Sequence, residues 1–254
     1  MKVIILSAGQ GKRLLPMTAT LPKCLLTVQG KTIIEWQIDE LHKCGIDDIT
    51  VVVGYNADKV ENLLQQRYGS TKIGTCCNPD YATTDNLISC WMAREEMTED
   101  FILLNGDTLF EAPIVETLLN APAAPITVTI NLKDSYDTDD MKVSLDGSRL
   151  LHVGKDIPPD KVDGESIGMI LFRNAGPQLF RNGLEKARAD QSCSRRWFLS
   201  VIDEIAGQDN TVSTCSIKGL AWCEVDFPAD LEQAERIVAA HFHRQEEMEA
   251  LPVS

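Results

Sequence analysis

The chain has 254 residues, of which 44% are hydrophobic and 24% are charged. This balance excludes a disordered protein and supplies enough apolar surface for one sizeable core or two small domains. The formal net charge of −14 argues against a general nucleic-acid or membrane-surface binder, because both need an extended basic face. An anionic ligand must therefore be met by a local basic patch.

The lengths of the apolar runs and the spacing of the cysteines indicate the compartment in which we expect the protein. The chain opens on a strand pattern without the features of a signal peptide, and none of its apolar runs approaches the roughly 18 residues of a membrane span. We therefore expect a cytoplasmic protein that does not bind a membrane. The eight cysteines form no C-x-x-C pair, so we expect reduced thiols, mostly buried, and neither a zinc site nor a redox motif.

The first motif is a glycine-bearing turn that follows an apolar run. Lys2–Leu6 has the length and β-branched content of a buried strand, and Ser7–Leu14 follows at its carboxyl end, where open α/β sheets bind ligands. The glycines let the backbone approach a ligand, and Lys12 and Arg13 supply charge. The turn thus suits a phosphate chain, although an ordinary turn with a solvated basic pair remains an alternative.

The first half of the chain alternates strands and helices. Helical spacing or buried-strand composition predicts a helix at Lys31–Cys44, a strand at Ile49–Gly54, a helix at Ala57–Tyr68, a strand at Ile73–Cys77, a helix at Leu87–Arg94 and a strand at Phe101–Thr108. This order predicts a parallel sheet with right-handed crossovers. The capping residues Thr83–Asn86 leave backbone N–H groups free for a ligand, and Asp107 falls at a strand's carboxyl end.

The second half is more mixed. We expect strands at Pro125–Leu132, Met141–Leu145, Arg149–Val153, Ile167–Phe172, Val212–Ile217 and Ala221–Val225, and helices at Ala175–Ala189, Arg196–Ala206 and from Pro228 onward. Asp146-Gly147 predicts a hairpin turn, and Asp230 and Glu232 suit the opening of the last helix. We therefore predict one domain over residues 1–254, with a nucleotide-binding half (1–121) and an acceptor-binding half (122–254).

Several motifs together resemble those of the nucleotidyltransferase family that makes activated sugars and alcohols. They are Ser-Ala-Gly-x-Gly-x-Arg-Leu after the first strand, Pro22-Lys23, Asn105-Gly106-Asp107, and Glu224-Val225-Asp226 before the last helix. The resemblance covers nearly the whole chain, and the first motif departs from the family only in Ser7, where alanine is usual. It implies a Rossmann-like α/β fold of GT-A type, with a mixed, mostly parallel central sheet flanked by helices.

Within that family the chain looks most like the phosphocholine cytidylyltransferase branch. The motifs are Thr84-Asp85-Asn86-Leu87-x-Ser89, Gly154-Lys155-Asp156, Glu165-Ser166-Ile167-Gly168 and Trp222-x-Glu224-Val225-Asp226. Sugar-1-phosphate enzymes usually carry a proline and a second glycine near the first of these motifs, and their absence favours a phosphorylated alcohol or a phosphonate. The resemblance alone implies that the nucleotide is CTP.

The resemblance assigns the nucleotide side of the site. Lys12 and Arg13 would hold the leaving pyrophosphate, and Lys23 would hold the α-phosphate. Together with the backbone of the glycine turn, the predicted nucleotide-binding set is Leu6, Ser7, Ala8, Gly9, Gln10, Gly11, Lys12, Arg13, Lys23, Asp85, Asn86, Ser89 and Asn105. Arg13, Lys23 and Lys155 are the predicted catalytic residues.

The chemistry implied is attack by a phosphate or phosphonate oxygen on the α-phosphorus of a triphosphate. Because two anions meet, charge neutralisation and alignment must carry most of the catalysis. Mg²⁺ prefers oxygen ligands and fits Asp107 and Asp226, whose alternative role is capping at strand ends. The attacking oxygen is already ionised, so no general base is needed and no catalytic role falls to His42, His152, His241 or His243.

The acceptor side is predicted from the resemblance and from charged and aromatic residues. Lys155, in Gly154-Lys155-Asp156, resembles the family's lysine for the acceptor's phosphate and would bind that phosphate, and Lys142 is a second candidate that could equally be a plain strand residue. The acids Asp139, Asp140, Glu165 and Glu224, with Trp222 or Trp91, would suit a cationic ammonium through charge pairing and cation–π contact. The alternative is that these acids are solvated and these tryptophans lie in the core.

Four further functions are alternatives to cytidylyl transfer, and two of them are disfavoured. A sugar-1-phosphate nucleotidylyltransferase is the nearest rival, and a non-catalytic nucleotide sensor is another, although a sensor could lose Asp107, Asp226 and Lys23 freely. A dinucleotide oxidoreductase is disfavoured because Gly9–Leu14 lacks the third glycine, and no Gly-Lys-Ser/Thr supports a P-loop ATPase. The sequence is compatible with a homodimer and does not identify the acceptor.

Overall fold

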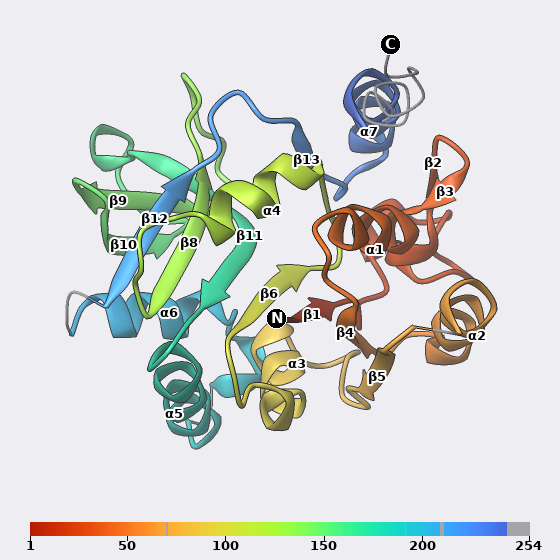
Figure 1. Ribbon diagram of the computed structural model, residues 1–254, viewed down its shortest axis with the longest axis horizontal. Coiled ribbons are helices and arrows are strands. Elements are labelled where there is room, and N and C mark those ends of the chain that lie inside the picture. Colours follow the sequence, from red (N-terminus) through yellow and green to blue (C-terminus); the bar gives the residue numbers. More distant parts are fainter. Residues whose placement is uncertain (70, 191, 209–210, 243–254) are drawn as a thin grey trace, which may run out of the picture.

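A mixed nine-stranded sheet runs through the computed structural model, which describes residues 1–242 except 70, 191, 209 and 210 (Figure 1). His243, which had no predicted role, lies outside the described residues. The strands are β1 (Lys2–Leu6), β2 (Thr27–Val28), β3 (Lys31–Thr32), β4 (Asp48–Val53), β5 (Ile73–Cys77), β6 (Phe101–Asn105), β7 (Thr108–Phe110), β8 (Ile126–Asn131), β9 (Lys142–Asp146), β10 (Arg149–Gly154), β11 (Gly164–Phe172), β12 (Val212–Ser216) and β13 (Trp222–Glu224).

The helices fall close to the predicted ranges. They are α1 (Ile33–Lys43), α2 (Ala57–Tyr68), α3 (Asn86–Met92), α4 (Ala112–Leu119), α5 (Gly176–Arg188), α6 (Leu199–Ala206) and α7 (Pro228–His241). Short 3-10 turns lie at Lys12–Leu14, Lys23–Leu25, Arg94–Glu96, Pro159–Lys161 and Cys193–Arg195. Helix α4, strand β7 and the β2–β3 hairpin were not predicted, because their segments are too short for a clear periodicity.

The strand order of the main sheet is β5-β4-β1-β6-β11-β8-β12-β10-β9. Parallel pairing is confined to β5-β4-β1-β6 and to β8-β12, and the other neighbours pair antiparallel. The mixed sheet is thus confirmed, but its parallel part is smaller than predicted. The reason is that β11 runs against both β6 and β8, and that the predicted β9–β10 hairpin extends the sheet.

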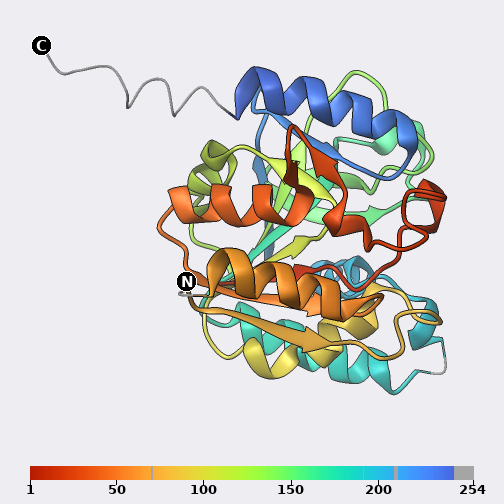
Figure 2. The same ribbon diagram turned by 90° about the vertical axis from the view of Figure 1, so that its right-hand side faces the viewer.

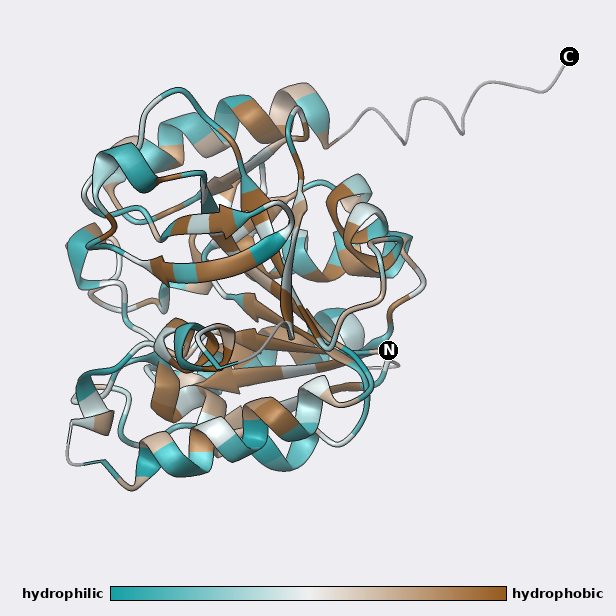
Figure 3. Cartoon of the chain, turned by 90° about the vertical axis from the view of Figure 1, so that its left-hand side faces the viewer, coloured by the Kyte–Doolittle hydropathy of each residue, from teal (hydrophilic) through white to brown (hydrophobic). Residues whose placement is uncertain are grey.

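Helices cover both faces of the sheet, as Figures 1 and 2 show. Residues of α1, α2 and α4 pack on one face of β1, β4 and β6, and residues of α3, α5 and α6 pack on the other. The strands are mostly hydrophobic, whereas hydrophilic residues gather on the outer sides of helices and in loops (Figure 3). None of the helices in the described ranges is long and apolar enough to cross a membrane. All eight cysteines are free thiols, as predicted, but only half of them are buried.

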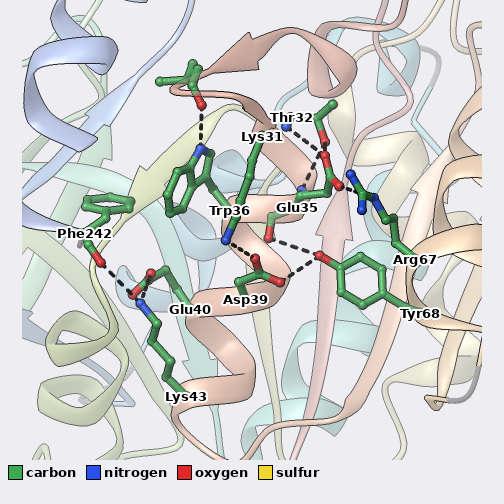
Figure 4. A network of polar contacts seen from close by, with 11 residues as sticks. Lys31, Thr32, Glu35, Trp36, Asp39, Glu40, Lys43, Arg67, Tyr68 and Phe242 are labelled. Carbon is green, nitrogen blue, oxygen red and sulfur yellow. Dashed lines mark hydrogen bonds and ion pairs between the residues drawn. The ribbon is translucent and has the colours of Figure 1, made fainter. Parts of the chain in front are cut away.

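Helix α1 is held by polar contacts to several other elements (Figure 4). Thr32 and Glu35 form a capping box at its start, which satisfies backbone N–H groups that a helix end leaves unpaired. Toward α2, Asp39 accepts a hydrogen bond from the Tyr68 hydroxyl at 2.8 Å. Toward α7, the Phe242 ring meets Trp36 edge to face at 5.6 Å between centroids. Helix α1 therefore joins the first and last parts of the chain.

Candidate active site

The glycine turn lies at the carboxyl edge of the parallel strands, as predicted. Leu6 at the end of β1 pairs in register with Val52 of β4 and Asn105 of β6, so the loops after these strands emerge together. Gly11 has φ +74°, and a Cβ there would lie 2.9 Å from the Cβ of Lys23. Because glycine avoids both the strain and the clash, the turn can lie directly against the Lys23 side chain.

A lysine and two aspartates form the centre of the site, which we call the carboxylate centre: Lys23, Asp107 and Asp226. The Lys23 ammonium donates to Asp107 Oδ2 at 2.7 Å and to Asp226 Oδ1 at 2.5 Å. Arg13 donates to the other oxygen of Asp226 at 3.1 Å. The structure therefore brings together four residues that the sequence analysis selected from separate motifs (Arg13, Lys23, Asp107 and Asp226).

The charges of the carboxylate centre stabilise one another. Burial lowers the pKa of Lys23, but Asp107 and Asp226 outweigh burial and raise that pKa overall. Burial likewise works to raise the pKa of Asp226, but Lys23 and Arg13 outweigh it and hold that pKa below its usual value. The lysine is thus cationic and Asp226 is anionic at neutral pH.

The two aspartates meet because the short strands β7 and β13 pair. Glu224 lies opposite Thr108 in this antiparallel ribbon, and the Val225 N–H donates to the Asp107 carbonyl at 3.1 Å. At the start of α7, Asp230 accepts hydrogen bonds from the backbone N–H groups of Asp226 and Phe227, at 2.8 and 2.7 Å. The ribbon and this helix cap therefore fix the position of Asp226 beside Asp107.

Hydrogen bonds from α1 fix the turn that carries Asp107. The side-chain amide of Gln37, which is buried, donates to the carbonyls of Asn105 and Thr108 at 2.8 Å each. These two residues bracket the Gly106-Asp107 turn. Gly106 is itself tightly packed, since a Cβ there would lie 2.5 Å from the Leu6 carbonyl oxygen. Both contacts restrict where the Asp107 carboxylate can point.

An inner hollow of about 230 Å³ opens beside Asp107. Its lining includes seven residues of the predicted nucleotide-binding set and one residue of the predicted metal pair, Asp107; the seven are Leu6, Ala8, Gly9, Asp85, Asn86, Ser89 and Asn105. Asn78 and Tyr81 also line it and were not predicted. The Asn86 side chain is already engaged, because its oxygen accepts from the Phe198 N–H at 2.9 Å. The amide N–H₂ group of Asn86 could still donate a hydrogen bond to a ligand.

A second, larger hollow of about 640 Å³ lies over the glycine turn. Gly9, Gln10, Gly11, Lys12 and Arg13 line one side of it, and Asp226 lies on its edge. Lys12 is exposed, and Arg195, which the sequence analysis missed, lines the opposite side. Three basic side chains therefore face a space bounded by backbone that a phosphate chain could approach.

An acidic cleft of about 600 Å³ lies on the other side of Asp226. Seven of its lining residues are acids, against one lysine: Asp137, Asp139, Asp140, Glu165, Glu224, Asp226 and Asp230, with Lys133. Trp222 lines the cleft as well, as predicted. Trp91 does not, because its ring lies under the guanidinium groups of Arg94 and Arg188, at 3.9 and 5.2 Å.

The two predicted acceptor lysines occupy different positions. Lys155 forms an ion pair with Asp139 at 3.2 Å, and its ammonium lies 4.7 Å from the centre of the Trp197 ring. It therefore lies at the margin of the acidic cleft. Lys142 is buried, and its ammonium donates to the carbonyl of Lys155 at 3.1 Å. The structure thus places Lys142 behind Lys155, where it supports the backbone of that residue.

Glu224 has the most perturbed carboxyl group of the acidic cleft. Burial, together with the neighbouring carboxylates of Asp107 and Asp226, raises the pKa of Glu224 to about 8. A cation that approaches Glu224 would favour its ionised form and lower this pKa.

The carboxylate centre also fits a magnesium ion. Within the described residues no group of three or more histidines, cysteines or acids is arranged for a metal. The buried oxygen Asp107 Oδ1, however, has no hydrogen-bond partner. Mg²⁺ is usually bound through only one or two carboxylates plus phosphate oxygens. The pair Asp107 and Asp226 supplies these carboxylates and suits this ion.

Residues missed from the sequence share one property. Lys133, Asp137, Arg195, Asn78 and Tyr81 line the three hollows but belong to loops without a recognisable motif. Only the excess of acid over residues 134–140 marked that loop, and Lys133 beside it carried no signal of its own. Their positions in the hollows depend on contacts between segments that are distant in the sequence, which no local motif shows.

Comparison with known proteins agrees with the geometry. Residues 2–140 match the family model described as "Nucleotidyl transferase". The chain is 30% identical to CMP-5'-(3-aminopropyl)phosphonate synthase of Streptomyces rubellomurinus over 92% of its length, and 38% identical to choline-phosphate cytidylyltransferase of Streptococcus pneumoniae over 44%. It spans 38% and 47% of the lengths of these relatives.

A solved structure shows the same fold over almost the whole chain. The inositol-1-phosphate CTP transferase of T. maritima superposes with a TM-score of 0.79, covering 93% of this chain and 96% of that one at 20% identity. This likeness confirms the predicted Rossmann-like α/β fold, and the family model confirms the resemblance deduced from the glycine turn and Lys23. The chain therefore belongs to the nucleotidyl transferase family.

Proposed function

We propose that this protein transfers CMP from CTP to a small phosphorylated or phosphonate amino alcohol and releases pyrophosphate. One observation carries the proposal: the carboxylate centre lies where the three hollows meet. Asp107 lines the inner hollow, and Asp226 lines both the glycine-turn hollow and the acidic cleft. A base with its ribose, a phosphate chain and an acceptor could thus converge on one point.

The residues around that point match the needs of nucleotidyl transfer. An acceptor oxygen attacks the α-phosphorus, and the bond from that phosphorus to the oxygen bridging to the β-phosphate breaks as pyrophosphate leaves. Lys23, which lies between Asp107 and Asp226, would neutralise charge on the α-phosphate, and Arg13 and Lys12, which line the glycine-turn hollow, would hold the pyrophosphate. The acceptor oxygen is already ionised near neutral pH, so the residues need not remove a proton.

Asp107 and Asp226 would hold the magnesium ion, as their chemistry and the unpartnered Asp107 Oδ1 allow. A bound Mg²⁺ supplies additional charge neutralisation on the triphosphate. The preference for CTP rests on the two cytidylyltransferase-like relatives and on the resemblance, since the inner hollow alone does not distinguish one base from another.

The acidic cleft supports an amino group on the acceptor. A carboxylate-rich cleft with Trp222 attracts a cationic head group through charge pairing and cation–π contact. Lys155 lies at the margin of the cleft and is placed to meet the acceptor's phosphate or phosphonate. A neutral sugar would find no counterpart for this charge, which is why we favour an amino alcohol over a sugar 1-phosphate.

A panel of triphosphates and acceptors tests the proposal. The purified protein with Mg²⁺ is incubated with CTP, UTP, GTP or ATP and with phosphocholine, 2-aminoethylphosphonate or a hexose 1-phosphate, and pyrophosphate release is followed. Release with CTP and an amino acceptor, but not without acceptor, is expected. Turnover with the hexose 1-phosphate alone would instead establish the sugar-nucleotide function, and binding of CTP without release with any acceptor would favour a sensor.

A further inference from the structure

Lys133 already occupies a site that could bind a small cation. Its ammonium lies 2.7 Å from Asp140 Oδ2 and 2.7 Å from Glu165 Oε2, and 5.5 Å from the centre of the Tyr136 ring. Glu165 is further fixed by Asn131, whose amide donates to its other oxygen at 3.1 Å. Two carboxylates and an aromatic ring are the groups that bind an alkylammonium ion, and here that ion is supplied by the chain itself.

Burial explains why this position must be filled. The Glu165 side chain is only 5% exposed, and Asp140 is 16% exposed. A carboxylate in such a position is strongly destabilised when its partner is removed, because the charge is left both unpaired and poorly hydrated. Lys133 therefore neutralises Glu165 in the resting protein and keeps it from pairing with another cation.

The other acids of the cleft are engaged to different degrees. Asp226 pairs with Lys23 and Arg13, Asp139 pairs with Lys155, and Asp230 accepts from backbone N–H groups. Among the cleft acids in the described part of the chain, this leaves Glu224 and the exposed Asp137 without a cation or a capping role. Glu224 lies two residues from Trp222 on the same short strand, β13.

We propose that Lys133 is a specificity-determining residue, whose ammonium fills the cation site of Asp140 and Glu165 and confines the acceptor's amino group to the part of the cleft beside Trp222 and Glu224. This inference rests on the proposed function and names its substrate class. The acceptor is a short molecule with a single amine, because a longer or doubly cationic acceptor finds the site of Asp140 and Glu165 already occupied by Lys133.

The first test does not depend on turnover. In Lys133→Ala the four-carbon stem and its charge are removed, and the space can admit n-propylammonium. We expect the variant to melt at a lower temperature than the wild type, and n-propylammonium chloride to raise its melting temperature by roughly 2–4 °C relative to sodium chloride at equal ionic strength. The wild type and Lys218→Ala, which changes an exposed lysine outside the cleft, should not gain this increment.

A double variant controls for general effects of the ammonium salt. Lys133→Ala combined with Glu165→Gln removes the more buried of the two unpaired charges, so it should fold better than Lys133→Ala alone and should lose most of the response to n-propylammonium. If n-propylammonium raises the melting temperature of Lys133→Ala no more than that of the wild type, the cation site does not exist and the proposal fails.

The second test measures acceptor selectivity. We expect Lys133→Ala to raise the ratio of kcat/KM for 5-aminopentylphosphonate over 2-aminoethylphosphonate by about tenfold, the effect of one favourable charge contact. Lys133→Arg and Lys218→Ala should keep the wild-type ratio. An unchanged ratio in Lys133→Ala would refute the confinement of the acceptor.

The two tests separate failure of this inference from failure of the proposed function. A wild-type protein that releases no pyrophosphate with any acceptor overturns the proposed function, while the ammonium response of Lys133→Ala still decides whether the cation site is present. A wild type that turns over 2-aminoethylphosphonate, combined with no ammonium response and no change of ratio, overturns only the role of Lys133.

Discussion

The proposed nucleotide side of the site is formed mainly by backbone groups, whereas the proposed acceptor side is formed mainly by charged side chains. The nucleotide side uses backbone at the ends of parallel strands, where Gly11 and Gly106 leave no room for a side chain. The acceptor side uses charged side chains from loops and antiparallel strands, and most of its acids are paired with lysines. The first surface is thus shaped by the course of the backbone, whereas the second is shaped by single charged side chains.

The carboxylate centre is the part both sides share, and its substitution should have the largest effect. Asp107→Asn and Asp226→Asn remove a charge that positions Lys23 and would hold Mg²⁺, so we expect each to lower kcat by roughly 100–1000-fold. Circular dichroism should show an unchanged fold. Asp58→Asn, at an exposed position of α2, should keep the wild-type rate. Near-normal turnover in both variants would remove the carboxylate centre from the reaction.

Lys155→Ala tests whether the two sides are separable. It removes the cation placed for the acceptor's phosphate, so we expect the KM for the acceptor to rise about tenfold while the KM for CTP stays within about twofold. Steady-state kinetics with each substrate varied in turn measures both constants. Lys161→Ala, also on the acceptor half but exposed, provides the control. A rise in the KM for CTP alone would mean that the two sides have been exchanged.

Gly106→Ala tests the backbone construction of the nucleotide side. A Cβ there would lie 2.5 Å from the Leu6 carbonyl oxygen and 2.3 Å from Ser7 Oγ, so the turn carrying Asp107 must shift. We expect the free energy of unfolding to fall by about 1–3 kcal/mol in urea titrations. Gly74→Ala in β5 is the matched control, because a Cβ there meets nothing within 4 Å. Equal stability of the two variants would contradict the tight packing.

Gln37→Leu should affect turnover only through the turn that carries Asp107. It removes two hydrogen bonds to the buried carbonyls of Asn105 and Thr108, so we expect a loss of about 1–3 kcal/mol in the free energy of unfolding. We also expect a lower kcat with an unchanged KM for the acceptor. Gln66→Leu, at an exposed position on α2, should change neither. A higher acceptor KM in Gln37→Leu would show that the turn also shapes the acidic cleft.

The same contrast explains what could be predicted from the sequence. Asp107 lies two residues after β6, and the glycine turn begins directly after β1, so the strand before each of them fixes its position. Lys23 lies beyond a long loop, and the Pro22-Lys23 motif of the family resemblance indicates it instead. Lys133 and Arg195 lie in loops, where position depends on distant contacts such as the pairing of Lys133 with Glu165. The parallel part of the sheet was overestimated for a related reason, because nothing local in β11 shows that it inserts antiparallel between β6 and β8.

Helix α1 carries none of the groups that face the three hollows, yet it supports both aspartates. Through Gln37 it holds the turn of Asp107, and through Trp36 it contacts Phe242 at the end of α7, the helix that begins directly after Asp226 and Phe227. If the chain were divided after residue 121 and expressed as two fragments, Asp107 and Asp226 would lie on separate polypeptides. Recovery of the active centre on mixing would then measure how firmly the two fragments associate through the β6–β11 and β7–β13 pairs and the contact of α1 with Phe242.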